Sequence, residues 1–111
     1  MTEIASDIFR TIGPGDAIRN NFVVSYYMDD HKRRVAIARV DERLYAFDDL
    51  CTCTDESCPL SGGMLTGMTI MCQCHGSQFD ITTGKVISGP AMEPLNVYEV
   101  FEVEGSIQLR A

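Results

Sequence analysis

The sequence predicts an all-β fold, an antiparallel β-sandwich or barrel with a small lobe at one end. Short segments rich in β-branched and aromatic residues recur along the chain, and turn residues separate them at intervals of about eight to twelve residues. Helical periodicity is scarce. Because 111 residues suit one hydrophobic core, we expect a single domain over residues 1–111.

The expected strands follow one another closely along the chain. Asp41-Glu42-Arg43 offers a tight turn between two of them, and Glu104-Gly105 divides a final hairpin. Thr83-Gly84-Lys85 is a further turn signal, and residues 16–20 are the best short helical candidate. The strands are expected at residues 22–27, 35–40, 44–47, 69–71, 78–81, 97–103 and 107–109.

Composition and charge exclude several classes of protein. Apolar residues make up 45% and charged residues 23%, which is typical of a globular chain and not of a disordered one. No apolar run approaches the roughly 20 residues of a membrane helix, and the N-terminus lacks the basic start of a signal peptide. We therefore expect a cytoplasmic protein without a membrane partner. The net charge of −7 argues against nucleic acid and for partners with a basic surface.

All five cysteines lie between residues 51 and 74, and His75 directly follows the last one. In a chain without an export signal, this clustering indicates metal ligands or redox groups more than inert core cysteines or a disulfide framework. The residues form two loop motifs, Cys51-Thr52-Cys53 and Cys72-Gln73-Cys74-His75-Gly76. Nearby glycine lets backbone N–H groups point at a charged centre. Four ligands from two such loops suit either a zinc ion or a two-iron cluster.

The second motif, within CHGSQFD, resembles that of the Rieske-type ferredoxins, where the ligands are Cys-x-His in one loop and Cys-x-x-His in the next. Ser61-Gly62-Gly63 resembles the end of the family's first loop, and TTGKVISGPAMEPLNVYEV resembles its closing segment. The resemblance extends from about Phe22 to the C-terminus. It implies a Rieske-like fold, a [2Fe–2S] cluster, a cluster-binding lobe at about residues 48–83 and a covering loop at Pro90.

The sequence departs from the family pattern at residue 53, where Cys53 stands in place of a histidine. Carried over by position, the resemblance implies that Cys51 and Cys72 hold the inner iron, and that Cys53 and His75 hold the outer iron. The result is a three-Cys, one-His site. A thiolate in place of a neutral imidazole adds a negative charge, which favours the oxidised cluster and lowers its reduction potential.

Two further residues affect the reduction potential that we expect for the cluster. The resemblance implies that the Ser77 hydroxyl hydrogen-bonds a cluster sulfur, whereas Phe79 stands where high-potential members carry a tyrosine. The missing phenol removes one interaction that stabilises the reduced state. We therefore predict a midpoint potential below about 0 mV, given a range of about −150 to +300 mV for two-histidine sites.

Cys58 and Cys74 remain outside this ligand set. Some Rieske proteins join an extra cysteine in each cluster loop by a disulfide, and the resemblance implies the same for Cys58 and Cys74. Two alternatives stay open: two reduced thiols, or Cys58 as an alternative ligand. Among nearby methionines, Met64, Met68, Met71 and Met92 are expected to fill gaps in the core, with an apolar docking rim around His75 as the alternative.

These observations favour a one-electron carrier that is not itself an enzyme and works as a monomer. By resemblance, the electron comes from a flavin-containing NAD(P)H reductase and passes to a terminal oxygenase. A mononuclear iron site for oxygen chemistry needs two histidines and a carboxylate, and only His31 remains once His75 is used. Two alternatives are a small subunit of a larger reductase, such as nitrite reductase, and a structural zinc module.

Overall fold

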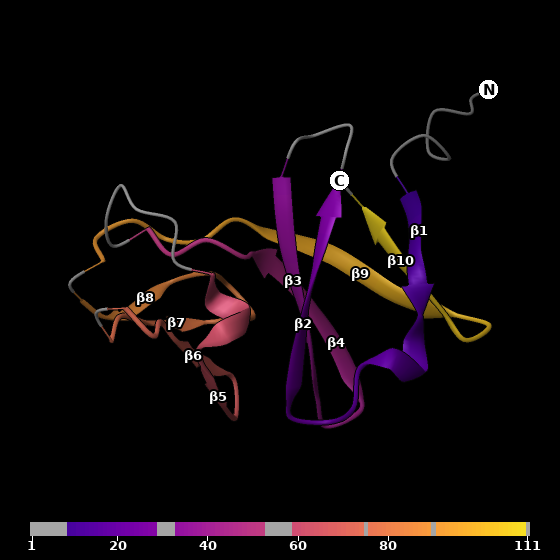
Figure 1. The fold of residues 1–111 in the computed structure, drawn as a ribbon, viewed down its shortest axis with the longest axis horizontal. Coiled ribbons are helices and arrows are strands. Elements are labelled where there is room, and N and C mark those ends of the chain that lie inside the picture. Colours follow the sequence, from indigo (N-terminus) through magenta and orange to yellow (C-terminus); the bar gives the residue numbers. More distant parts are fainter. Residues whose placement is uncertain (1–8, 29–32, 53–58, 75, 90, 111) are drawn as a thin grey trace.

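The structure is a computed structural model that describes residues 9–28, 33–52, 59–74, 76–89 and 91–110 (Figure 1). Four residues of the predicted site, Cys53, Cys58, His75 and Pro90, lie outside these ranges, as does His31. Within them the regular structure is strand apart from two short 3-10 turns, which confirms the predicted all-β class. No helix among the described residues is long and apolar enough to cross a membrane.

The larger part of the molecule, which we call the body, is an antiparallel sheet with strand order β1-β10-β9-β4-β3-β2. Its longest ladder pairs β2 with β3, from Phe22 opposite Arg39 to Met28 opposite Arg33. In contrast, β4 and β9 are paired only at Ala46–Tyr98 and Phe47–Val97. The strands of the body are β1 (Phe9–Pro14), β2 (Phe22–Met28), β3 (Arg33–Val40), β4 (Arg43–Asp48), β9 (Val97–Val103) and β10 (Ser106–Arg110).

Both predicted hairpins of the body are present. The β3–β4 turn places Asp41 and Glu42 at φ of 52° and 72°, and the β9–β10 turn places Glu104 and Gly105 at 50° and 79°. Two successive residues with positive φ are the geometry of a type I′ turn, whose twist matches that of the flanking strands. The turn residues of the sequence therefore set the register of both hairpins.

A smaller antiparallel sheet, which we call the lobe, lies at the end of the molecule away from β1 and β10 (Figure 1). It is inserted between β4 and β9 in the chain, and its strand order is β5-β6-β7-β8. The molecule extends 44 Å along its longest axis. The lobe strands are β5 (Met64–Thr66), β6 (Thr69–Met71), β7 (Gln78–Asp80) and β8 (Val86–Ser88).

Some local structure differs from the sequence-based expectation. The helix candidate at residues 16–20 is only a 3-10 turn, η2 (Gly15–Ala17), because Ile18 is already extended and its side chain is buried in the body. β1, β5 and β8 were not predicted. β5 and β8 have three residues each and, unlike the equally short β6 and β7, do not lie beside a ligand motif that draws attention to them. β8 also lies beyond the expected limit of the lobe at Thr83.

Strand β3 is buried on both faces and separates two hydrophobic cores. Val35 and Ile37 point into the body core, which also contains Ile107 and Leu109 of β10. The alternate residues Ala36 and Ala38 face a second cluster, which we call the joint core because it combines β3 and β4 with the lobe. Its members include Phe47, Cys51, Leu60, Ile70, Cys72, Phe79, Ile81 and Leu95.

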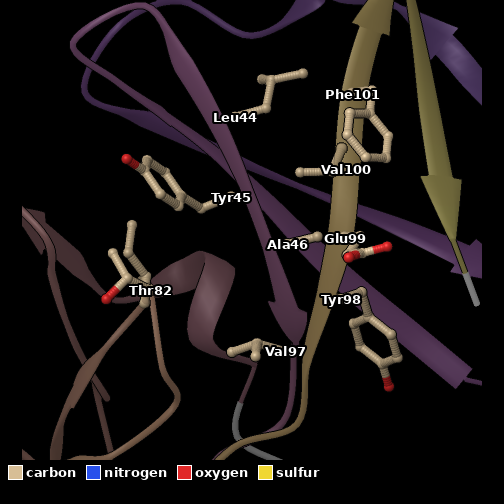
Figure 2. Close-up of a pocket in the computed structure, with 10 residues that line it drawn as sticks. Leu44, Tyr45, Ala46, Thr82, Val97, Tyr98, Glu99, Val100 and Phe101 are labelled. Atoms are coloured by element: carbon tan, nitrogen blue, oxygen red, sulfur yellow. The ribbon is translucent and has the colours of Figure 1, made fainter.

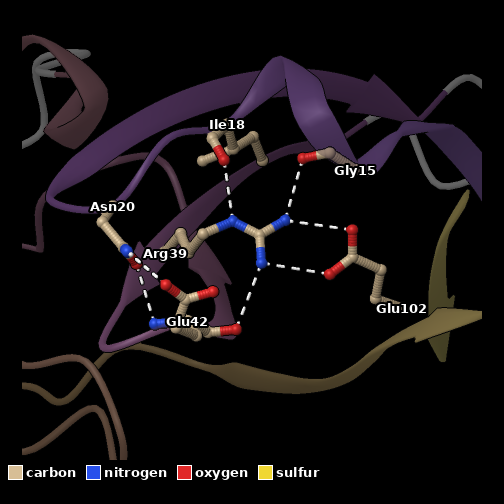
Figure 3. A network of polar contacts seen from close by, with 6 residues as sticks. All are labelled: Gly15, Ile18, Asn20, Arg39, Glu42 and Glu102. Carbon is tan, nitrogen blue, oxygen red and sulfur yellow. Dashed lines mark hydrogen bonds and ion pairs between the residues drawn. The ribbon is translucent and has the colours of Figure 1, made fainter. Parts of the chain in front are cut away.

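The side chain of Arg39, near the β3–β4 turn, connects several elements of the body (Figure 3). The guanidinium of Arg39 donates to the carbonyl oxygens of Ile18 and Gly15 at 2.7 and 2.8 Å, and to that of Glu42 at 3.1 Å. It also forms a two-point ion pair with Glu102, at 3.0 and 3.2 Å. Because this side chain is only 11% exposed, its donors need these acceptors, which join η2, β3 and β9.

Candidate metal centre

The first predicted ligand loop begins directly after β4. Cys51 lies three residues beyond the end of that strand, and its side chain is buried, with 5% exposed. The adjacent Thr52 donates its hydroxyl to the carbonyl oxygen of Glu93 at 2.6 Å. The loop returns to described structure at Pro59 and the 3-10 turn η3 (Leu60–Gly62). Cys51 is thus placed in the interior.

The second predicted ligand loop connects β6 to β7 and contains a tight turn. The Cys72 N–H donates to Ser77 O at 2.7 Å, and the Gly76 N–H donates to Cys72 O at 3.0 Å. Gly76 has a φ of +78°, a conformation that glycine adopts without a side-chain penalty. Inside this turn, the Cys74 N–H points at Cys72 Sγ, 3.4 Å away. An N–H donor in this position can stabilise negative charge on a ligand sulfur.

A third segment, residues 91–96, which we call the covering segment, contacts a described residue of each ligand loop. Its Ala91 N–H donates to the Ser77 hydroxyl oxygen at 3.0 Å, and both residues are buried. Because the Thr52 hydroxyl binds Glu93 O, the segment is attached to each ligand loop by one side-chain hydrogen bond. Pro90, on which the predicted covering loop centres, lies outside the described residues, so its place over the cluster stays a prediction.

The structure buries two of the four predicted ligands in one cluster of side chains. Cys51 and Cys72 belong to the same buried cluster, the joint core, with 5% and 1% of their side chains exposed. Within the described ranges, no group of three or more His, Cys, Asp or Glu side chains is placed to hold a metal ion. The other two predicted ligands, Cys53 and His75, lie outside those ranges, so the complete four-residue set stays a prediction.

The described residues fit an iron–sulfur cluster in their chemistry. Two sulfur donors come from separate loops, an N–H group points at one of them, and the Ser77 side chain is fully buried beside them. The Ser77 oxygen accepts from Ala91, which leaves its own hydroxyl hydrogen for another acceptor. A buried hydroxyl of this kind suits a cluster sulfur, whereas a structural zinc ion needs no such donor.

Three more residues were predicted to lie near the cluster: Phe79, Cys58 and Cys74. Phe79 is fully buried in the joint core, so the place where the family resemblance puts a phenol is filled by an apolar ring. Cys74 forms a disulfide bond. Its predicted partner, Cys58, lies outside the described residues, and the pairing of these two residues stays a prediction.

The methionine prediction is wrong for two of four residues. Met68 packs against the joint core, and Met71 is half-buried on β6. Met64 is 60% exposed and Met92 is 90% exposed, so neither fills a gap in the core. Met92 lies between Ala91 and Glu93, the two residues that attach the covering segment to the ligand loops. Its exposure agrees with the alternative, an apolar rim near the loops.

A shallow groove lies on a different face, between β4, β9 and the turn after β7 (Figure 2). Its volume is about 350 Å³, and none of its lining residues is a predicted cluster ligand. β4 and β9 separate beyond the Ala46–Tyr98 pair, which leaves Tyr45 and Phe101 at the groove walls. The groove follows from the short β4–β9 pairing and is not a site for the cofactor.

Sequence reasoning missed two polar residues of the site. Thr52 was treated only as a spacer in Cys51-Thr52-Cys53, although it binds the covering segment. Asp49 was included in the loop region, but its complete burial was not foreseen. An aspartate directly before a ligand loop, with a serine directly after it, is a signal that could have identified the pair.

Comparisons with known proteins agree with this geometry. The Rieske [2Fe-2S] domain family matches residues 11–99. The chain is 41% identical over 73 residues to ferredoxin CarAc of Metapseudomonas resinovorans, which covers 66% of each protein. It is 35% identical over 94 residues to the biphenyl dioxygenase ferredoxin subunit of Pseudomonas sp. strain KKS102, covering 85% of this chain and 77% of that one. The chain thus spans about two thirds or more of these relatives.

Solved structures show the same fold. A chain in the complex of reduced oxygenase and oxidized ferredoxin of carbazole 1,9a-dioxygenase superposes with a TM-score of 0.82 at 29% identity, covering 93% of both chains. A putative NADH-dependent nitrite reductase small subunit from Mycobacterium tuberculosis has a TM-score of 0.81 at 19% identity, covering 94% of this chain and 95% of that one. At such low identity, the second likeness concerns the fold alone.

Proposed function

Because the chain belongs to the Rieske [2Fe-2S] domain family, we propose that it is a ferredoxin that carries one electron on a [2Fe–2S] cluster to a terminal oxygenase. The observation that carries this proposal is the joint burial of Cys51 and Cys72, one from each ligand loop. The relatives are ferredoxin components of oxygenase systems, which supports a carrier and not a catalyst.

The proposed ligands are Cys51 and Cys72 for the inner iron and Cys53 and His75 for the outer iron. When bound, the cluster supplies a one-electron redox couple. The protein buries the inner thiolates, places the Cys74 N–H against Cys72 Sγ, and directs the Ser77 hydroxyl inward. The likeness of the second motif to the family pattern supports His75, and the position of Cys53 after Cys51-Thr52 supports a three-Cys, one-His set.

The proposed cluster has a low reduction potential. Three thiolates carry more negative charge than two, and the buried Phe79 ring donates no hydrogen bond to the cluster region. The N–H and hydroxyl donors at Cys74 and Ser77 raise the potential, so we expect a value between those of all-cysteine and two-histidine sites, below about 0 mV.

We also propose a disulfide between Cys58 and Cys74 that joins the two ligand loops. The disulfide bond of Cys74 supports this pairing. With the covering segment bound to both loops, such a link would give three separate connections around the cluster.

The proposed partners are a flavin-containing NAD(P)H reductase and a terminal oxygenase, each with a basic docking surface. The net charge of −7 supports electrostatic steering towards such surfaces. Exposed apolar side chains support a short-range contact at the lobe end, where Met92 is 90% exposed and Ile87 is 54% exposed. We expect the chain to act as a monomeric single domain.

A second candidate function is a small subunit of a nitrite reductase. The structural likeness to such a subunit favours it, but that likeness concerns only the fold. The ferredoxin relatives and the two buried cysteines at the loops support the carrier instead. The third candidate is a structural zinc module, and analysis of the bound metal distinguishes it from an iron–sulfur protein.

Purification under nitrogen with iron, sulfide and zinc analysis tests the proposal. We expect a red-brown protein with equal iron and sulfide, and a reduced form with an electron paramagnetic resonance signal. Two variants test the ligands: Cys53→His should keep the cluster and raise its potential, whereas Cys53→Ala should lose iron. The control, Cys74→Ser, should keep both irons. A colourless zinc protein, or full iron content in Cys53→Ala, would overturn the proposed cluster or its ligand set.

A further inference from the structure

Asp49 is a fully buried carboxylate that lies immediately before the first ligand loop and outside the proposed ligand set. Its two carboxylate oxygens both bind Ser61, which lies immediately after that loop. Oδ1 accepts the Ser61 N–H at 2.7 Å, and Oδ2 accepts the Ser61 hydroxyl at 3.0 Å. One side chain thus joins the two ends of the loop that contains Cys51.

The backbone strengthens the same closure. The Leu60 N–H donates to Asp49 O at 2.6 Å, and Leu50 forms a β-bridge with Pro59. None of these contacts includes a proposed ligand atom, so the loop ends meet through protein groups alone. Three hydrogen bonds to a single residue hold the two described ends of the loop together, since a buried donor or acceptor that loses its partner is costly.

The charge of Asp49 is only partly compensated. Arg34 Nε lies 3.6 Å from Asp49 Oδ2, but the arginine side chain is 46% exposed and also donates to Ser25 Oγ at 3.3 Å. A half-exposed cation at this distance is screened by water, whereas the carboxylate has no contact with solvent. The field of Asp49 therefore acts mainly through the protein interior, in which Cys51 also lies.

We propose that Asp49 is a positioning residue for the cluster: its carboxylate closes the first ligand loop before metal binds, and its buried charge then lowers the reduction potential of the bound cluster. This inference rests on the proposed function for its second part only. Because Asp49 already holds the loop ends together, Cys51 is in its buried position before metal binds. Metal binding then does not have to supply the free energy of ordering these ends. A fixed negative charge near the cluster disfavours the added electron.

The first test uses the metal-free full-length protein and measures amide hydrogen exchange at Leu60 and Ser61. Asp49→Ala should lose protection at the Ser61 amide by about tenfold or more, because its side-chain acceptor is gone. The Leu60 amide donates to the backbone oxygen of residue 49, which the substitution keeps, so its smaller loss of protection reports how far the loop ends separate. The matched control is Asp48→Asn, since the neighbouring carboxylate accepts from Asn96, which precedes β9, and from Tyr98 of β9, and neither contact involves Leu60 or Ser61. Unchanged protection at Ser61 in Asp49→Ala, or an equal loss in the control, would overturn the loop-closing role.

The second test uses the cluster-loaded protein and compares Asp49→Asn with Ser61→Ala. The amide introduced by Asp49→Asn keeps an acceptor for Ser61 but has no charge, so the midpoint potential should shift to a more positive value while the loop stays closed. Ser61→Ala keeps the charge and loses one hydrogen bond, so its potential should stay unchanged while iron is released to a chelator roughly tenfold faster. Equal potentials in Asp49→Asn and the unchanged protein would overturn the electrostatic part.

The experiments distinguish an error in either part of this inference from an error in the proposed function. If the protein binds no iron–sulfur cluster, the proposed function is wrong, and the exchange experiment still decides whether Asp49 closes the loop. If the cluster binds with the expected ligands, but Asp49→Ala leaves exchange unchanged and Asp49→Asn leaves the potential unchanged, only the role of Asp49 is wrong.

Discussion

The body core and the joint core are both fully buried, but they differ in the groups that fill them. The body core consists of aliphatic side chains, such as Ile37 and Ile107, between long hydrogen-bonded ladders. The joint core mixes Ile70 and Phe79 with two cysteines at the ligand loops, and its sheet has strands of three residues. Strand β3 contributes to both, with bulky residues on one face and Ala36 and Ala38 on the other.

This difference indicates which region depends on the cofactor. Hydrophobic burial alone accounts for the body core, since none of its members is ionisable. In the joint core, a buried thiol is a small apolar group, but a buried thiolate needs a metal or several donors. The joint core should therefore reach its full stability only with the cluster bound, whereas the body should not respond to it.

The largest expected effect comes from the same substitution placed in each core. Ile37→Ala and Ile70→Ala each empty a fully buried site and should each cost about 2–5 kcal/mol. We expect Ile37→Ala to lower the free energy of unfolding equally with and without the cluster. Ile70→Ala should in addition accelerate cluster loss. Urea unfolding followed by circular dichroism, with and without bound iron, measures both.

A substitution at an exposed position serves as the control for the two core substitutions. Ile87→Ala removes the same atoms from an exposed position on β8 and should change stability by no more than about 0.5 kcal/mol. If Ile37→Ala also accelerates cluster loss as strongly as Ile70→Ala does, the two cores act as one unit and the comparison fails.

The body could be predicted from sequence more completely than the lobe, for a physical reason. β2, β3 and β9 are long enough for their β-branched and aromatic residues to form a pattern, and Asp41-Glu42 and Glu104-Gly105 mark the turns between them. The three-residue strands β5 and β8 carry no such pattern. Their pairing follows from tertiary contacts that a single sequence does not reveal.

The site shows the same contrast. Ligand spacing predicted a site that contains Cys51 and Cys72, because metal chelation imposes a short sequence motif, and both cysteines are buried in the joint core. The contact of Thr52 with Glu93 joins residues that are distant in the chain, and no local motif specifies it. The contact of Asp49 with Ser61 spans only the first loop, where an aspartate at one end and a serine at the other were the available signal. The exposure of Met92 was also missed, since residue type alone favours burial of methionine.

A smaller effect is expected from two glycines with similar backbone angles, one in each region. Gly84 of the lobe has a φ of +83°, and a Cβ there would overlap the carbonyl oxygen of Leu95. Gly105 of the body has a φ of +79° with open space around it. Gly105→Ala should cost about 1 kcal/mol from backbone strain alone. Gly84→Ala should cost about 2–4 kcal/mol, because the overlap adds to that strain.

Thermal unfolding of the two glycine variants measures this difference, and hydrogen exchange locates it. We expect Gly84→Ala to expose the Leu95 amide, which donates to Gly84 O at 2.8 Å. Equal destabilisation by both substitutions would mean that the covering segment yields without resistance, contrary to its attachment to both ligand loops.

The smallest expected effect is a dependence of the stability of the lobe on pH. The Thr82 hydroxyl and N–H donate to Asp80 Oδ1 at 2.6 and 2.8 Å, and these two hydrogen bonds hold the pKa of the Asp80 carboxyl below its ordinary value. A carboxyl with a lowered pKa in the folded state stabilises the fold above its unfolded pKa of about 4. This contribution is lost as the pH falls through the lower, folded value.

Thr82→Val removes the stronger of the two donors and keeps the backbone N–H. We expect the pKa of Asp80, followed by carbon-13 NMR of its carboxyl, to move back towards the ordinary value. The acid-induced loss of lobe stability should still begin near the unfolded pKa, but it should be complete at a higher pH and be smaller in size, while exchange at the β2 and β3 amides stays the same. A matching change in those body amides would show that the turn after β7 stabilises both regions, and the independence of the body from the lobe would have to be abandoned.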